Sequence, residues 1–154
     1  MPAGAHLAGK LIASLAFTAA ALLIIYPLGL IAGVRLAPER WAALLLVHLA
    51  SVLPFALLGL GLGYRLGSKG AVAAANAFFL GFAVIGGLWM PIAALPEVLR
   101  SLAWATPSFH LGELALRAAG VARTTPLAAH LSALLALTLA FGLFAWTGWR
   151  RGTA

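Results

Sequence analysis

The sequence predicts an all-α integral membrane protein with four transmembrane helices, and three observations support that fold class. Hydrophobic residues make up 64% of the chain and charged residues only 8%, whereas a soluble domain is typically about 45–50% apolar and about 25% charged. Four apolar stretches reach the length of about 20 residues that crosses a bilayer. A proline-containing insert between the third and fourth stretches predicts a pair of short re-entrant or interfacial helices.

The first predicted span covers residues 11–34 and lies between Lys10 and Arg35. Its 24 residues are enough to cross a bilayer with some tilt. A cleaved signal peptide is the alternative, but its apolar core would be only about 7–15 residues long. We therefore expect a span that is retained in the mature protein.

The second predicted span covers residues 41–64. Trp41 and Tyr64 stand at its two ends, where amphipathic aromatic side chains prefer to sit at the membrane–water interface. Pro54 lies within it and should kink the helix, because proline removes one backbone hydrogen bond and its ring clashes with the preceding turn.

The third and fourth predicted spans cover residues 71–90 and 126–149. A polar turn at residues 65–70 precedes the third span, and Arg150 and Arg151 follow the fourth. The length of 154 residues allows one domain, so we expect all four spans to belong to a single membrane domain that covers residues 1–154.

The insert at residues 91–125 cannot be one straight span. Irregular backbone at membrane depth is tolerated only where it is buried in protein, lines a wet cavity or lies at the headgroup level. The residues that interrupt it are three prolines and four charged side chains: Pro91, Pro96, Pro107, Glu97, Arg100, Glu113 and Arg117.

The prolines of the insert predict where two short helices begin. Pro96 can occupy the first helical position, with Glu97 complementing the helix dipole in the first turn. Thr106 and Pro107 read as the N-cap and first residue of a second helix, and Gly120 as its C-terminal stop.

Charge and cysteine content exclude several function classes. The net charge is +7, but the basic residues are scattered singly between apolar runs and form no nucleic-acid-binding patch. The chain has no cysteine, so disulfides, thiolate metal sites and a cysteine nucleophile are excluded. Basic residues divide five against five between the two sides. The side with the termini has them in short, acid-free segments, which weakly favours cytoplasmic termini.

No catalytic or metal-binding constellation is visible in the sequence. The four histidines are not paired with one another or with acidic residues at metal-ligand spacing. His48 lies in the middle of a predicted span, where a hydrogen bond to a neighbouring helix is the preferred interpretation over a functional role. An intramembrane enzyme that uses His48 or His110 remains an alternative.

Three further patterns in the sequence carry weaker signals. Glu113 and Arg117 are four residues apart, the spacing of an ion pair on one helix face, and a charged element at the mouth of a translocation path is the alternative. The glycines at residues 59–70 lack the spacing of a phosphate-binding loop, which disfavours nucleotide binding. Asn76 could join helices or line a path.

The insert resembles the C-terminal half of ABC-2 type permeases, the membrane subunits of bacterial ABC exporters. The stretches GGLWMPIAALPEVLR and ATPSFHLGELALR carry the resemblance. Residues 6–11 look like the family's entry into its third span, and residues 58–70 like the end of its fourth span and the following loop. Eight positions match the family pattern: Pro91, Leu95, Pro96, Leu99, Arg100, Pro107, Glu113 and Arg117.

The resemblance implies a role and a topology. The family has six spans, so we expect this chain to correspond to the last four. The protein would lie in the bacterial inner membrane with both termini cytoplasmic. The insert would cap the exit of an export path, with the exit-gate residues Pro91, Pro96, Glu97, Arg100, Pro107, Glu113 and Arg117.

The resemblance also implies partners. A separate ATP-binding-cassette subunit would hold ATP and Mg²⁺, so no cofactor, catalytic residue or metal ligand is expected in this chain. A second permease copy or half and the lipid bilayer complete the expected partners. The expected surface for coupling to the ATPase consists of His6, Lys10, Arg65 and Lys69. The alternative is a four-helix membrane scaffold or assembly factor without transport activity.

Overall fold

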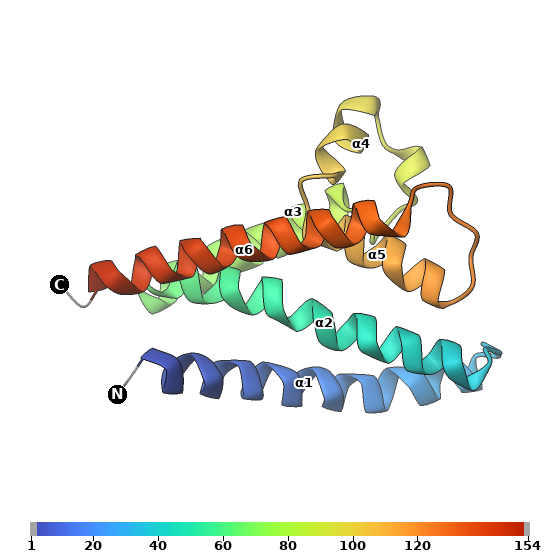
Figure 1. Cartoon of the computed structure of the whole chain (residues 1–154), viewed down its shortest axis with the longest axis horizontal. Coiled ribbons are helices and arrows are strands. Elements are labelled where there is room, and N and C mark those ends of the chain that lie inside the picture. The colour runs from blue at the N-terminus through green and yellow to red at the C-terminus, as the bar shows by residue number, and fades with distance from the viewer. Residues whose placement is uncertain (1–2, 153–154) are drawn as a thin grey trace.

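The computed structural model describes the backbone of residues 3–152 and the side chains of residues 8–151. Within that range it is built from helices and contains no strand, as the sequence predicts. The long helices run up and down beside one another, and the two ends of the chain lie at the same end of the molecule (Figure 1). The elements in order are α1 (Ala3–Ile31), α2 (Pro38–Gly63), α3 (Ser68–Ile85), η1 (Ile92–Ala94), α4 (Glu97–Ala103), α5 (Pro107–Ala118) and α6 (Leu127–Gly152).

Four of these helices, α1, α2, α3 and α6, are long and apolar enough to cross a membrane. Most of their large apolar side chains are exposed in the isolated chain, as Phe17, Ile31 and Leu139 are. Exposed apolar surface of this extent is a liability in water but suits a lipid solvent. The prediction of a four-helix membrane fold is therefore confirmed.

Helix α2 is the central helix of the bundle. It packs most extensively against α6 and also contacts α1, α3 and α5, whereas α1 packs mainly against α2. Pro54 is fully buried in the middle of α2. Gly61 faces α6 so closely that an added Cβ would lie within 2.5 Å of the Phe144 ring, which shows how tightly α2 and α6 pack.

The third long helix ends earlier than the sequence suggested, at Ile85 instead of Met90. Gly86 caps the helix, and Gly87 adopts a φ of +77°, a left-handed conformation that glycine reaches without a steric cost. The amide of Leu88 then donates to the carbonyl of Ala83, which completes the termination. Residues 86–90 therefore belong to the insert.

The insert forms the two short helices that its prolines predict. Helix α4 begins at Glu97, with Pro96 as its N-cap instead of its first residue. Helix α5 begins at Pro107, and the Thr106 hydroxyl accepts a hydrogen bond from the amide of Phe109. Gly120 follows α5 with a φ of +92°. The placement of these helices in the membrane as re-entrant or interfacial elements stays a prediction.

Helix α5 is the most buried helix among the described residues, although it has only 12 residues. Seven of its twelve residues are buried, and it packs against α2, α3 and α6. It lies at the end of the bundle opposite the chain termini, where α4 and η1 project to one side (Figure 1). The polar residues of the insert therefore gather around α5.

Candidate functional site

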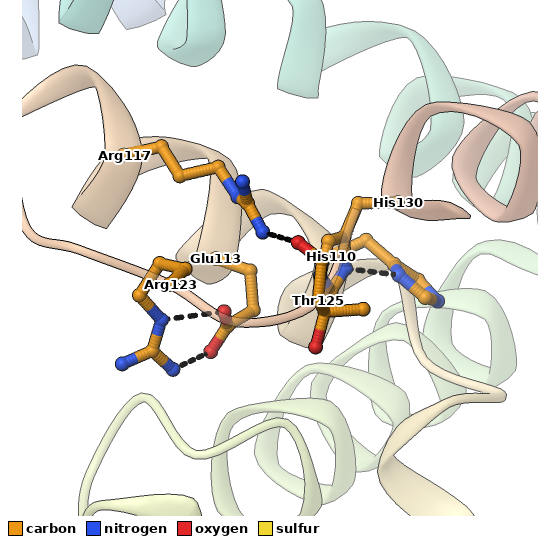
Figure 2. Close-up of polar contacts among 6 residues, drawn as sticks. All are labelled: His110, Glu113, Arg117, Arg123, Thr125 and His130. Atoms are coloured by element: carbon orange, nitrogen blue, oxygen red, sulfur yellow. Dashed lines mark hydrogen bonds and ion pairs between the residues drawn. The ribbon is translucent and has the colours of Figure 1, made fainter. Parts of the chain in front are cut away.

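A pair of fully buried histidines joins α5 to the start of α6. His110 and His130 have no exposed surface, and their Nδ1 atoms lie 3.0 Å apart. The Nε2 atom of His110 lies 2.9 Å from the carbonyl oxygen of Trp104, and the Trp104 ring stacks on His130 with an interplanar angle of 14°. Figure 2 shows the two imidazoles turned toward each other from their separate helices.

These contacts fix where the protons of the neutral pair reside. The Trp104 carbonyl can only accept, so Nε2 of His110 carries the proton and its Nδ1 is a bare acceptor. His130 must then donate from its own Nδ1, which leaves its Nε2 as a bare acceptor. That Nε2 is buried and has no hydrogen-bond partner. The pair thus takes one arrangement of protons, and a further proton would have no acceptor beside His130.

The expected ion pair between Glu113 and Arg117 is wrong. The buried Glu113 carboxylate pairs with Arg123, whose Nε donates to Oε2 at 2.7 Å and whose Nη2 donates to Oε1. Arg117 instead donates to the backbone carbonyl of Thr125. Figure 2 shows these as two separate contacts, Arg117 with Thr125 and Arg123 with Glu113.

The physical reason is the loop that follows α5. The left-handed Gly120 turns the chain back over its own helix, so Arg123 and the Thr125 carbonyl come within reach of the two side chains. An i,i+4 pair on an isolated helix is worth only about 0.2–0.5 kcal/mol. A bidentate arginine–carboxylate pair in a partly buried site is stronger and prevails.

The pair also sets the charge state of Arg123, which lies outside the four long helices. Its hydrogen bond to the Glu113 carboxylate raises the pKa of Arg123, and the nearby negative charge adds to the rise, whereas burial opposes it. The guanidinium therefore stays charged.

The Glu113–Arg123 pair separates two cavities. A cavity of about 420 Å³ lies under the insert, and its lining includes Pro91, Arg100 and both members of the pair. An open groove of about 560 Å³ lies on the side of α2, and Arg117 and Arg123 both line it. Arg123 is thus the residue common to the two cavities.

The structure gathers some of the predicted exit-gate residues and leaves others apart. Pro91, Arg100 and Glu113 share the cavity under the insert, and Pro107 is fully buried at the start of α5. Pro96 and Glu97 are exposed on the outside of the insert. Among the described residues, the Glu97 carboxylate takes no part in the hydrogen bonds and the ion pair recorded around α5.

The expected coupling residues lie at the end of the molecule with the chain termini. Lys10 and Lys69 are exposed, whereas the side chain of His6 falls outside the described residues. Arg65 is half-buried and joins the turn after α2 to α6, because it donates to the Phe144 carbonyl and the Thr147 hydroxyl. Its guanidinium also lies 3.8 Å from the centre of the Phe144 ring.

An open cleft of about 680 Å³ separates α1 from α2 near the same end, and Lys10 and Tyr64 line it. Three hydroxyl side chains also line this cleft within the spans: Ser14, Thr18 and Ser51. The other residues that line the cleft within the spans are apolar.

The two histidines on which the enzyme alternative depends, His48 and His110, are both engaged in hydrogen bonds. His110 is enclosed, and both of its ring nitrogens have partners. His48 contacts Tyr26 on α1 at 3.2 Å and the Leu44 carbonyl at 2.7 Å, which confirms the preferred interpretation of a hydrogen bond to a neighbouring helix. Among the described residues, no group of three or more His, Asp or Glu side chains could hold a metal ion.

Sequence reasoning missed the histidine pair and Arg123. His110 and His130 are 20 residues apart, a separation that carries no local signal, and Arg123 is one of several scattered arginines. The only available pointer was that both histidines lie in apolar surroundings, where an ionisable side chain needs a partner.

Comparison with known proteins gives one informative match. The chain is 27% identical over 113 residues to the Bacillus subtilis (strain 168) protein named "Putative transport permease YvfS". The chain is similar to a transport permease. The match covers 73% of this chain and 46% of that protein, so the matched region spans about half of the relative's length. No protein-family model matches the chain, and no solved structure matches it.

This similarity and the four long apolar helices together support a membrane permease role. They also agree with the resemblance that the insert shows. The similarity favours a transport subunit over an enzyme, in keeping with the enclosed histidines.

Proposed function

We propose that the chain is the membrane subunit of an ABC-type exporter that moves a substrate outward, powered by ATP hydrolysed on a separate subunit. The observation that carries the proposal is the similarity to a transport permease over 73% of the chain. The ordered motif of the insert supports the narrower assignment to the ABC-2 type.

The contacts suggest how a push from an ATPase would travel. Lys10 and Lys69 offer exposed positive charges at one end of the molecule. Arg65 ties the turn between α2 and α3 to the last turns of α6 through two hydrogen bonds. A force on that turn would therefore move α2 and α6 together, and α2 contacts α5 at the opposite end.

At the opposite end the insert would act as the exit gate. The cavity under the insert is lined by residues of η1, α4 and α5, so a movement of α5 relative to η1 and α4 would change its shape. His110 holds α5 to the Trp104 carbonyl at the end of α4 and to His130 of α6, and the Glu113–Arg123 pair holds α5 to the loop that follows it. A second permease copy or half would complete the path.

The partnership is tested by co-expression with candidate ATP-binding-cassette subunits from the same genome. We expect one of them to co-purify with the chain in detergent and its ATPase activity to depend on the permease. Lys10→Glu with Lys69→Glu should weaken the association, whereas Lys10→Arg with Lys69→Arg should not. Failure of the wild-type proteins to associate under any substrate condition would contradict the proposal.

The topology is tested separately by cysteine labelling, for which the cysteine-free chain is well suited. Ala94 is exposed in η1, so Ala94→Cys should react with a membrane-impermeant maleimide in intact cells. Ser68→Cys, in the opposite turn, should react only after lysis. The reverse pattern would place the termini outside the cytoplasm.

The alternative is a four-helix membrane scaffold or assembly factor. It would need no ATPase and would show no substrate-dependent change at Ala94. Loss of export in cells on Arg100→Gln, with normal levels of the protein in the membrane, would favour the exporter, because a scaffold has no use for the cavity that Arg100 lines.

A further inference from the structure

Three arginines meet at the end of α5 with only one carboxylate among them. Arg40, in the first turn of α2, donates to the Ala119 carbonyl at 3.1 Å, and Arg117 donates to the Thr125 carbonyl. Arg123 takes the Glu113 carboxylate in the only salt bridge recorded among the described residues. Two of the three cations are thus bound only by neutral backbone oxygens, and the region keeps excess positive charge.

Arg117 has unused capacity to donate hydrogen bonds. Its Nε is buried and has no partner. An unsatisfied buried donor on a charged group is costly, and an anion placed beside it would remove that cost. The planar guanidinium fork matches the oxygens of a phosphate group especially well.

The groove beside Arg117 combines apolar walls with arginine side chains. It holds about 560 Å³ between α2, α5 and the start of α6. Its apolar walls come from Ala43, Val47, Leu114 and Leu127. Arg117 and Arg123 also line it, and of these two arginines only Arg117 has no carboxylate partner. A ligand that fills such a groove needs an anionic head and an apolar tail.

The level of the groove along α2 matches the boundary between headgroups and acyl chains. Ala43 and Val47 lie five and nine residues after Pro38, about 8 and 14 Å along the helix at 1.5 Å per residue. The hydrocarbon core is about 30 Å thick and is shorter than α2. The contact of Arg40 with Ala119 holds the end of α5 level with the first turn of α2, so the arginines lie at the headgroup side.

We propose that this groove binds an anionic membrane lipid, with its phosphate on Arg117 and an acyl chain along Ala43 and Val47. Basic pockets between membrane helices are known to hold anionic headgroups. A free phosphate would satisfy the arginine but leave the apolar walls unfilled. The inference rests on the chain spanning a membrane and is independent of transport.

The test measures lipid binding to the purified full chain by native mass spectrometry, with phosphatidylglycerol and phosphatidylcholine as probes. We expect the wild type to retain one phosphatidylglycerol in preference to phosphatidylcholine. Arg117→Gln should weaken that retention roughly tenfold, the effect of losing charge-assisted hydrogen bonds. Arg35→Gln is the matched control, because Arg35 is exposed and lies outside the groove.

A second variant keeps the test valid if Arg117→Gln fails to fold. Ala43→Phe fills the apolar wall and preserves every arginine, and it should also weaken phosphatidylglycerol retention. Excess inorganic phosphate should not displace the lipid from the wild type. Equal loss in Arg35→Gln and Arg117→Gln, retention unchanged by Ala43→Phe, or displacement by inorganic phosphate would each overturn the proposal.

Discussion

Helix α1 is mostly apolar, whereas α5 also carries Ser108, His110, Glu113 and Arg117, and the two helices contribute to the molecule in opposite ways. α1 has 29 residues, packs mainly against α2 and has a single buried side chain among its described residues, Leu22. α5 has 12 residues, seven of them buried, and contacts three helices. In a lipid solvent, length and hydropathy place a helix across the membrane, whereas specific contacts determine which helices form a rigid unit.

The comparison predicts that a glycine-to-alanine substitution where α3 ends against α5 lowers the unfolding free energy much more than the same substitution within α3. At Gly86 an added Cβ would lie 2.0 Å from the Ser108 hydroxyl, 2.5 Å from the Phe82 carbonyl and 2.9 Å from the Phe109 amide. Because two of these neighbours are backbone atoms, we expect Gly86→Ala to cost about 3 kcal/mol of unfolding free energy or more. Unfolding in SDS titrations measures it.

Gly81→Ala is the matched control for that variant. It lies within α3, five residues before Gly86, and has nothing within 4 Å of the added methyl group, so it should be neutral or stabilising, because alanine has the higher helix propensity. Equal effects of the two substitutions would mean that α3 and α5 do not pack as closely as the structure shows.

The second prediction concerns the partner of Glu113. Glu113→Arg alone should cost about 2 kcal/mol or more, because it places a second buried cation beside Arg123. The double reversal Glu113→Arg with Arg123→Glu should recover most of the loss. Glu113→Arg with Arg117→Glu should recover none, because Arg117 faces the Thr125 carbonyl. If only Glu113→Arg with Arg117→Glu recovered the loss, Glu113 would pair with Arg117 and not with Arg123.

The third prediction concerns the contact between α5 and α6. His130→Phe preserves the ring against Trp104 but removes the donor to Nδ1 of His110. We expect a loss of about 1–2 kcal/mol, the cost of an unsatisfied buried acceptor. The double variant His110→Phe with His130→Phe should lose less than the sum of the single variants. Additive losses would show that the two rings do not interact.

The sequence was sufficient for elements whose cause is local. The four long helices follow from hydropathy, and the start of α5 follows from Thr106 and Pro107, because a cap and a proline act within one turn. Gly87 could not be recognised as a helix end inside an apolar run, so the third span was predicted to extend to Met90.

The site was less accessible because its contacts bridge elements. Glu113 was identified, but its partner depended on how the loop after Gly120 returns over α5. The histidine pair depended in the same way on the docking of α6 against α5. Arg65 was expected to belong to the surface that couples to the ATPase, and only the packing of α6 shows that its guanidinium is engaged with Phe144 and Thr147.

The smallest effect is expected on α1. Tyr26→Phe removes a single hydrogen bond, the one between the Tyr26 hydroxyl and His48, and leaves the ring packed against Trp41 with 5.0 Å between centroids. His48 keeps its contact with the Leu44 carbonyl, so no buried group loses its only partner and the cost should be about 0.5–1 kcal/mol. Tyr26→Ala should cost more, because it also removes the aromatic contact. If Tyr26→Phe matched Gly86→Ala in an SDS titration, α1 would be bound as firmly as α5, and the contrast between the two helices would be wrong.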